Sequence, residues 1–147
     1  MKILIDADGC PVVSIVCELC TKHAVPCLIL CDTSHEIHQT NAQTLVFDKG
    51  TDSVDYALIG RISPGDLVIT QDYGLASLCL ARNARAFHQD GWEYTIHNMD
   101  ALLFSRYESK KLRKSGARIK GAKKRTKQQD QAFRSALEKI LQTVVQG

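Results

Sequence analysis

The first ninety residues alternate between short apolar runs and segments in which apolar residues recur at helical spacing. A continuous apolar run suits a strand that is buried on both faces of a sheet. Strands separated by helices are typical of a parallel sheet with right-handed crossovers. The sequence therefore predicts an α/β fold, with strands at residues 2–6, 28–30, 45–47, 66–70 and 84–87.

Helical segments separate and follow these runs. Pro11 suits the first turn of one helix, and Thr51 suits the N-cap of another. Thr126 and Gln129 have the spacing of a capping box, which predicts a final amphipathic helix. Helices are expected from Pro11 to about His23, from Thr51, from Tyr73 to Arg82, from about Leu102 to Ser115 and, after a basic loop at 116–125, through Phe133 to Val144.

The charge of the chain changes sign near residue 100. Residues 1–100 carry 6 Lys and Arg against 13 Asp and Glu, whereas residues 101–147 carry 13 against 3. We expect one domain over 1–147, with an acidic α/β core at 1–97 and a basic helical extension at 98–147. A basic extension on an acidic body favours contact with a polyanion, and a solvated helical face is the alternative interpretation.

No segment of the sequence looks suited to a membrane or to export. No apolar run approaches the roughly 18 residues that a membrane-spanning helix needs. After Met1 and Lys2, only the apolar residues 3–5 precede the first aspartate, so the apolar stretch of about 7 to 15 residues in a secretory signal is not seen. We therefore expect a cytoplasmic protein that makes no membrane contact.

Six cysteines are present, and a reducing compartment should keep them as thiols. Cys27, Cys31, His35 and His38 superficially resemble a zinc-binding set. Their spacing matches no common zinc module, and Cys27 and Cys31 fall in an apolar run that predicts a buried strand. Core packing is therefore the favoured interpretation.

Aspartates recur where strands are expected to end and helices to begin. Asp6 ends the first strand, and Asp8 follows two residues later. Asp72 follows the strand at 66–70, while Asp52 and Asp55 lie in the first turn of a helix. Because the carboxyl ends of parallel strands share one crevice, these side chains are expected to converge, with Ser53, Thr70 and Gln71 as candidate polar helpers. Capping of helices and turns is the alternative role for each of them.

Converging carboxylates predict a metal site. Like charges a few ångströms apart repel one another, and a divalent cation removes that cost. Ligands that are all oxygen select hard cations, so Mg²⁺ or Mn²⁺ is the expected cofactor. Such ions activate water for phosphodiester hydrolysis.

The basic extension points to a nucleic acid as the partner of this site. Its density of cations predicts contacts with the phosphate backbone and a steep salt dependence. Tyr73 and Trp92 are candidates for stacking on bases, with core packing as the alternative. The residues expected to bind nucleic acid are Lys110, Lys111, Arg113, Lys114, Arg118, Lys120, Lys123, Lys124 and Arg125.

Four segments carry a resemblance to a known family. They are Ile-Asp-Ala-Asp-Gly-Cys-Pro at 5–11, Gly-Thr-Asp-Ser-Val-Asp at 50–55, Gly-Asp-Leu-Val-Ile-Thr-Gln-Asp-Tyr-Gly-Leu-Ala at 65–76, and Lys-Leu-Arg-Lys at 111–114 with Lys-Gly at 120–121. At these segments the chain resembles the bacterial YaiI/YqxD family, from Met1 to about Leu141. That family is grouped by fold with the PIN-like nucleases.

The resemblance implies a PIN-like three-layer sandwich with a central, mainly parallel sheet and a C-terminal basic helical extension. It also implies a metal-dependent ribonuclease, whose clustered acids match Asp6, Asp8, Asp52, Asp55 and Asp72 here. The chain departs from the family pattern at Gly9, at Val13, at residues 88–91 and at residues 121–124. Asp90 stands where the family has an arginine, so one expected phosphate contact is missing.

Three functions are compatible with these features. The leading hypothesis is a Mg²⁺- or Mn²⁺-dependent nuclease with Asp6, Asp52 and Asp72 as metal ligands and with Asp8 and Asp55 as further ligands or water-orienting groups. A non-catalytic RNA-binding or ribosome-associated module, in which the acids only cap helices, is the alternative. A hydrolase of small phosphoesters is the third, and it would not need the basic segment for binding.

Overall fold

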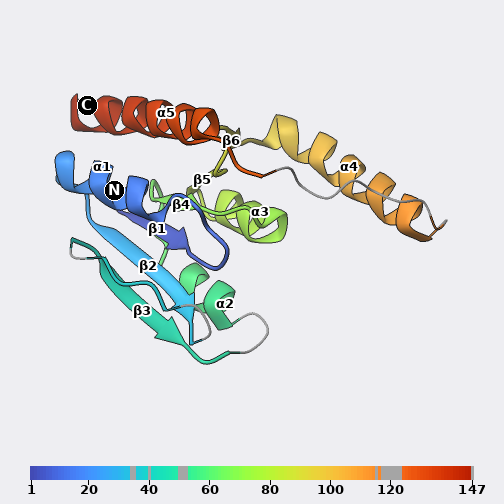
Figure 1. Cartoon of the computed structure of the whole chain (residues 1–147), viewed down its shortest axis with the longest axis horizontal. Helices are drawn as coiled ribbons and strands as arrows, with labels where there is room; N and C mark the ends of the chain where they lie inside the picture. The colour runs from blue at the N-terminus through green and yellow to red at the C-terminus, as the bar shows by residue number, and fades with distance from the viewer. Residues whose placement is uncertain (34–35, 40, 50–52, 115, 117–123, 147) are drawn as a thin grey trace.

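The structure, a computed structural model, describes residues 1–33, 36–39, 41–49, 53–114, 116 and 124–146. In this part of the chain a six-stranded sheet has helices on both faces (Figure 1), which confirms the predicted α/β fold. In chain order the elements are β1 (Ile3–Asp6), α1 (Val13–Lys22), β2 (Cys27–Asp32), β3 (Gln43–Phe47), α2 (Ser53–Ile59), β4 (Leu67–Ile69), α3 (Tyr73–Ala81), β5 (Arg85–Phe87), β6 (Glu93–Tyr94), α4 (Ile96–Lys114) and α5 (Lys127–Gln146).

The strands lie in the order β3-β2-β1-β4-β5-β6. Neighbouring strands are parallel except β5 and β6, which are antiparallel. In the centre of the sheet, Ile5 of β1 is in register with Ile29 of β2 and with Ile69 of β4. The chain moves outward from β1 to β3 and then returns to β4, so the strand order reverses between β1 and β4. Ligands of open α/β sheets bind at the carboxyl ends of strands at such a switch point.

Two hydrophobic cores lie on opposite faces of the sheet. Because side chains alternate along a strand, Ile3 and Ile5 pack with α1 and α5, whereas Leu4 packs with α2, α3 and the start of α4. On the first face, Phe133 of α5 packs on Phe87 of β5, with ring centroids 5.6 Å apart. The result is three layers, as expected for the sandwich.

Most helix and strand boundaries lie close to the predicted ones. The predicted capping box is confirmed at the start of α5: the Thr126 backbone N–H donates to Gln129 Oε1 at 2.8 Å, and the Gln129 N–H donates to Thr126 Oγ1 at 3.3 Å. The two-residue strand β6 was not predicted. The predicted N-cap Thr51 lies outside the described residues.

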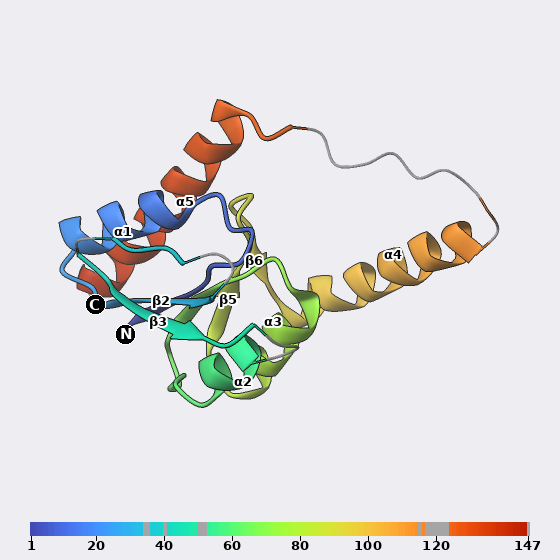
Figure 2. The ribbon, with the colours of Figure 1, turned by 60° about the horizontal axis from the view of Figure 1, so that its bottom comes forward.

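Helix α4 starts on the body of the molecule and then extends away from it (Figure 2). At its start, Tyr73 Oη donates a hydrogen bond of 3.1 Å to the carbonyl oxygen of Met99. Farther along α4, Leu103, Phe104 and Tyr107 are exposed. No helix among the described residues has the length and apolar character needed to cross a membrane.

Helix α5 returns to the sheet beside α1, as Figures 1 and 2 show. Phe133, Leu137 and Leu141 are fully buried there and belong to the core of that face. Ion pairs between the two helices join Lys22 to Glu138 and Arg134 to Glu18. The chain beyond residue 98 therefore contains both a projecting helix and a helix that completes the core.

The cysteines are free thiols, and all except Cys10 are buried. Cys27 and Cys31 lie in β2, as the strand interpretation predicted. His35 is outside the described residues. The burial of this pair of cysteines in the core agrees with the favoured interpretation.

Candidate functional site

Two of the predicted site residues flank the switch point of the sheet. Asp6 ends β1, and Thr70 follows the adjacent strand β4. The Thr70 hydroxyl donates a hydrogen bond of 2.9 Å to Asp6 Oδ2 and accepts one of 3.0 Å from the backbone N–H of Asp72. This single side chain therefore links the end of β1 to the start of α3.

Asp72 is the N-cap of α3. Its Oδ1 accepts a hydrogen bond of 3.1 Å from the backbone N–H of Leu75. The capping role that the sequence left open for Asp72 is thus confirmed. Because capping fixes the side chain, the carboxylate is held at the carboxyl edge of the sheet beside Thr70.

The electrostatics of Asp6 show that further acids lie near it. Burial raises the pKa of Asp6 to about 6, the Thr70 hydrogen bond opposes this rise, and the charges of Asp55, Asp72 and Asp8 add to it. Three other predicted acids therefore lie near enough to Asp6 for their charges to act on it. The fifth, Asp52, lies outside the described residues.

The donor chemistry of these acids suits Mg²⁺ or Mn²⁺, because hard cations prefer carboxylate oxygen. The half-buried, partly desolvated Asp6 also lacks a cationic partner among the hydrogen bonds that it makes. Among the described residues, however, no three His, Cys, Asp or Glu side chains lie close enough to form a metal site. A cation bound here would therefore need other oxygen donors, such as water or a substrate phosphate.

Asp32 is a carboxylate that the sequence analysis did not include. It ends β2, the strand that neighbours β1, and so lies at the same edge of the sheet. The signal for it was available, since an aspartate directly follows the apolar run that contains Cys27 and Cys31.

The predicted RNA-binding residues fall into three groups. Lys110, Lys111 and Lys114 are exposed on the projecting part of α4, and Lys124 is exposed before α5. Arg125 has a different environment, described below. Residues outside the description are Arg118, Lys120 and Lys123, together with the side chain of Arg113.

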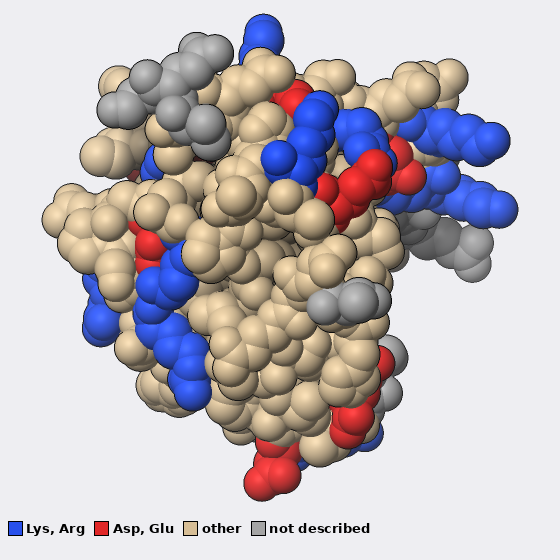
Figure 3. Space-filling view, turned by 90° about the vertical axis from the view of Figure 1, so that its left-hand side faces the viewer, with Lys and Arg blue, Asp and Glu red and all other residues tan. Residues whose placement is uncertain are grey.

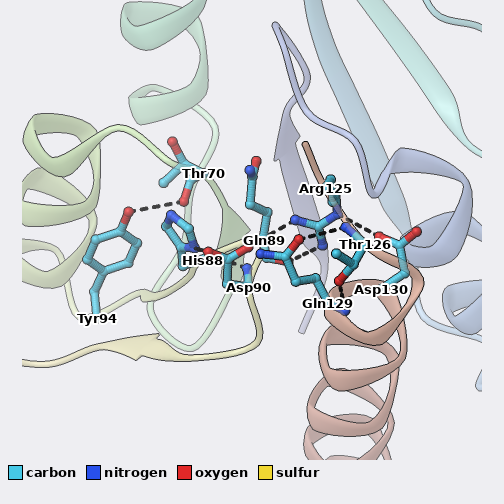
Figure 4. A network of polar contacts seen from close by, with 9 residues as sticks. All are labelled: Thr70, His88, Gln89, Asp90, Tyr94, Arg125, Thr126, Gln129 and Asp130. Atoms are coloured by element: carbon cyan, nitrogen blue, oxygen red, sulfur yellow. Dashed lines mark hydrogen bonds and ion pairs between the residues drawn. The ribbon is translucent and has the colours of Figure 1, made fainter. Parts of the chain in front are cut away.

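Arg125 is held in a polar network at the start of α5 (Figure 4). Its guanidinium pairs with Asp130 at 2.6 Å and with Asp90 at 2.9 Å, and it donates to the carbonyl oxygen of Gln89 at 2.7 Å. Its side chain is only 18% exposed. Asp90 thus pairs with Arg125, and RNA binding by Arg125 stays a prediction.

The network is reinforced by a close backbone approach. Gly91 has a φ of +92°, which side-chain-bearing residues rarely adopt. A Cβ atom at this position would lie 3.1 Å from the carbonyl oxygen of Ala132 in α5. The loop between β5 and β6 therefore packs closely against the backbone of α5.

The two aromatic residues suggested for base stacking have structural roles instead. Trp92 stacks on His88, with centroids 4.4 Å apart and planes 9° apart, and meets Tyr94 edge-on. Tyr73 is half-buried and bonds to α4. The core-packing alternative is therefore the correct one. Phe104 and Tyr107 on α4 are aromatic residues that are exposed, each at 63%.

Charge is distributed unevenly over the surface. On the end of the molecule that Figure 3 shows, basic and acidic side chains lie side by side. Mixed charge of this kind gives no continuous surface for a polyanion. The lysines of α4 lie instead on a helix where Glu108 is the acidic residue nearest to them in the sequence.

The sequence profile of the family described as "Uncharacterized BCR, YaiI/YqxD family" matches residues 4–143. The chain belongs to this family. The YaiI/YqxD match covers most of β1 and all of β4 and α3, and it includes Asp6, Thr70 and Asp72.

Individual relatives agree with the family match. The chain is 45% identical over 141 residues to a "UPF0178 protein" of Exiguobacterium sibiricum, covering 96% of each chain. It is 42% identical over 137 residues to a "UPF0178 protein" of Ruminiclostridium cellulolyticum, covering 93% of this chain and 90% of the relative. No solved structure matches this YaiI/YqxD chain.

Proposed function

We propose that the chain is a Mg²⁺- or Mn²⁺-dependent nuclease that hydrolyses phosphodiester bonds of RNA in the cytoplasm. The observation that carries this proposal is the group of carboxylates Asp6, Asp8, Asp55 and Asp72 at the switch point of the sheet. A half-buried carboxylate with three acidic neighbours is unfavourable unless a cation neutralises it. Perturbed acids at such an edge are typical of functional sites, and the PIN-like resemblance agrees with the proposed reaction.

The proposed roles follow from the positions of the described acids and, for Asp52, from the sequence alone. Asp6 and Asp72 hold the cation together with Asp52, and Asp8 and Asp55 are further ligands or orient the attacking water. The cation, when bound, lowers the pKa of water and stabilises charge on the leaving oxygen. Thr70 orients the Asp6 carboxylate, and capping orients that of Asp72.

Helix α4 supports RNA as the substrate. Lys110, Lys111 and Lys114 are exposed on it, and Phe104 and Tyr107 are exposed one to three turns earlier. Cations interleaved with aromatic rings are typical of single-strand binding surfaces, since phosphates bind the cations and bases stack on the rings. The helix starts beside Tyr73, the residue that follows Asp72, so a strand bound on α4 can reach the carboxylates.

Metal binding is the first test, because it needs no knowledge of the RNA sequence. Mn²⁺ is titrated into the protein and its Asp72→Asn variant in a calorimeter. The asparagine keeps an oxygen for the N–H of Leu75, so the cap survives while the charge is lost. We expect saturable binding that weakens at least tenfold in the variant and is unchanged in Glu18→Gln, a control on α1.

Cleavage is then measured on a labelled RNA oligonucleotide with Mn²⁺ present. Asp6→Asn and Asp72→Asn should each abolish cleavage without loss of the fold. Full cleavage by both variants would refute the proposal.

A non-catalytic RNA-binding or ribosome-associated module is the second candidate. The capping bond of Asp72 favours it, because that bond explains the position of this acid without catalysis. This function predicts RNA binding that depends on salt but not on Mn²⁺, with no cleavage of any RNA that binds.

A further inference from the structure

A groove of about 470 Å³ lies between α2 and α3 and reaches the candidate site at two of its aspartates. Asp55 and Asp72 line it near the start of α3. Arg82 lines it at the other end of α3, where it is the C-cap. Ten residues separate Asp72 from Arg82, so the groove follows a helix length of about 15 Å.

Between these charged ends the lining of the groove is apolar. Leu75 is buried, whereas Leu78 is 51% and Tyr56 is 78% exposed. Large apolar side chains left exposed beside a cavity are typical of ligand-binding surfaces. A flat ring such as that of Tyr56 is suited to stacking on a nucleobase.

Arg82 adds a cation to the end of the groove that is distant from the acids. Its guanidinium makes no hydrogen bond or ion pair with the part of the chain that the structure describes. An arginine without such a partner, at the edge of a cavity, is well suited to bind phosphate oxygens in a bidentate manner.

We propose that this groove binds one unpaired nucleotide of an RNA strand. This nucleotide is adjacent to the phosphate that binds at the cluster of aspartates. The base lies on Tyr56 and Leu78, and Arg82 binds the following phosphate. The volume falls within the roughly 300 to 1,000 Å³ of small-ligand pockets. A base in the groove cannot be paired, so single-stranded RNA is the substrate class. This inference rests on the proposed nuclease function.

Binding is tested without hydrolysis, in EDTA, by the fluorescence anisotropy of a labelled single-stranded RNA oligonucleotide and of the duplex with the same sequence. Tyr56→Ala and Arg82→Ala should each weaken binding of the single strand roughly tenfold and leave duplex binding unchanged. Tyr56→Phe keeps the ring and should bind as the unsubstituted protein does. Arg134→Ala, a control on the opposite face of the sheet, should not change the affinity.

Location is tested by photo-crosslinking an oligonucleotide that carries one 4-thiouridine. Crosslinked peptides should include Tyr56. Unchanged affinity of both Tyr56→Ala and Arg82→Ala, or crosslinks confined to α4, would overturn the proposal. Because Tyr56 and Arg82 are exposed, neither substitution removes a buried core contact.

The two proposals fail in distinguishable ways. If Tyr56→Ala weakens single-strand binding but no RNA is cleaved with Mn²⁺, the groove is supported and the nuclease proposal is refuted. If cleavage depends on Asp6 and Asp72 while Tyr56→Ala and Arg82→Ala bind normally, the nuclease proposal is supported and the groove is refuted.

Discussion

The hydroxyl of Thr70 donates a hydrogen bond of 2.9 Å to Oδ2 of Asp6, across the point where the strand order of the sheet reverses. This bond is the main interaction that favours the charged form of a carboxylate which burial and three other acids disfavour. The protonation state of Asp6 is therefore sensitive to a residue on the neighbouring strand.

Loss of this hydrogen bond should raise the pKa of Asp6 further. In Thr70→Val the shape of the side chain is kept but the donor is lost, so the pKa of Asp6 should rise above about 6. The carboxyl carbon of Asp6, followed by NMR during a pH titration, measures this change. Thr44→Val is the control, because the hydroxyl of Thr44 donates to the carbonyl oxygen of Ile37 and not to Asp6. An unchanged titration midpoint in Thr70→Val would contradict the role of the Thr70 hydrogen bond in lowering the pKa of Asp6.

Asp6 should also make the stability of the protein depend on pH. Its pKa is about 6 in the folded chain and near 3.8 when exposed, so the folded state binds more protons between these values. Stability from this group therefore falls as the pH rises from 4 to 6. Asp6→Asn should be more stable above pH 6, by up to about 3 kcal/mol, and equal to the unsubstituted protein near pH 4.

Thermal unfolding at several pH values measures this difference. Asp48→Asn, which changes an exposed carboxylate, provides the baseline. A difference in stability between the unsubstituted protein and Asp6→Asn that stays constant from pH 4 to pH 8 would contradict the prediction.

The lysines of α4 should account for part of the salt dependence of RNA binding. Each phosphate contact contributes about 0.7 to the slope of log affinity against log salt for a single strand. Replacing Lys110, Lys111 and Lys114 by Gln should therefore reduce the slope by roughly 2. Lys139→Gln, on α5, is the control and should leave the slope unchanged. Equal slopes for the triple variant and the unsubstituted protein would show that these lysines of α4 do not contact RNA phosphates.

Arg125 should affect stability more than RNA binding. Arg125→Ala leaves Asp90 and Asp130 without their guanidinium partner, which should lower the free energy of unfolding by about 1 to 3 kcal/mol. Denaturant unfolding measures the change, and Lys124→Ala, at an exposed neighbour, is the control. A large loss of RNA affinity with unchanged stability would show instead that Arg125 binds RNA.

Much of the fold could be predicted because strands buried on both faces leave continuous apolar runs. The runs around Ile5 and Ile69 identified β1 and β4 directly. Strand β6 could not be predicted, since it has two residues and is held by contacts such as the packing of Trp92 on Tyr94. Such contacts exist only once the sheet has formed.

In the candidate site, too, residues next to apolar runs could be predicted, whereas contacts between distant segments could not. Asp6 and Asp72 could be predicted because each follows an apolar run. The pairing of Asp90 with Arg125 could not, because the fold joins residues from two distant segments. Nor did helical spacing reveal that Phe104 and Tyr107 face solvent, since an apolar stripe usually packs against a core.

The packing of α5 on α1 has a consequence for how the chain folds. Phe133, Leu137 and Leu141 of α5 pack in one core with β1 and α1, which lie on the order of a hundred positions earlier in the chain. On the other face, α3 packs on the strand that follows it, β5, and α2 packs on β2 and β1 across a shorter stretch of chain. Closing so long a loop is slow compared with pairing neighbours in sequence. In a refolding experiment the face beneath α2 and α3 should gain protection from hydrogen exchange first. The face beneath α5 should follow in a later kinetic phase.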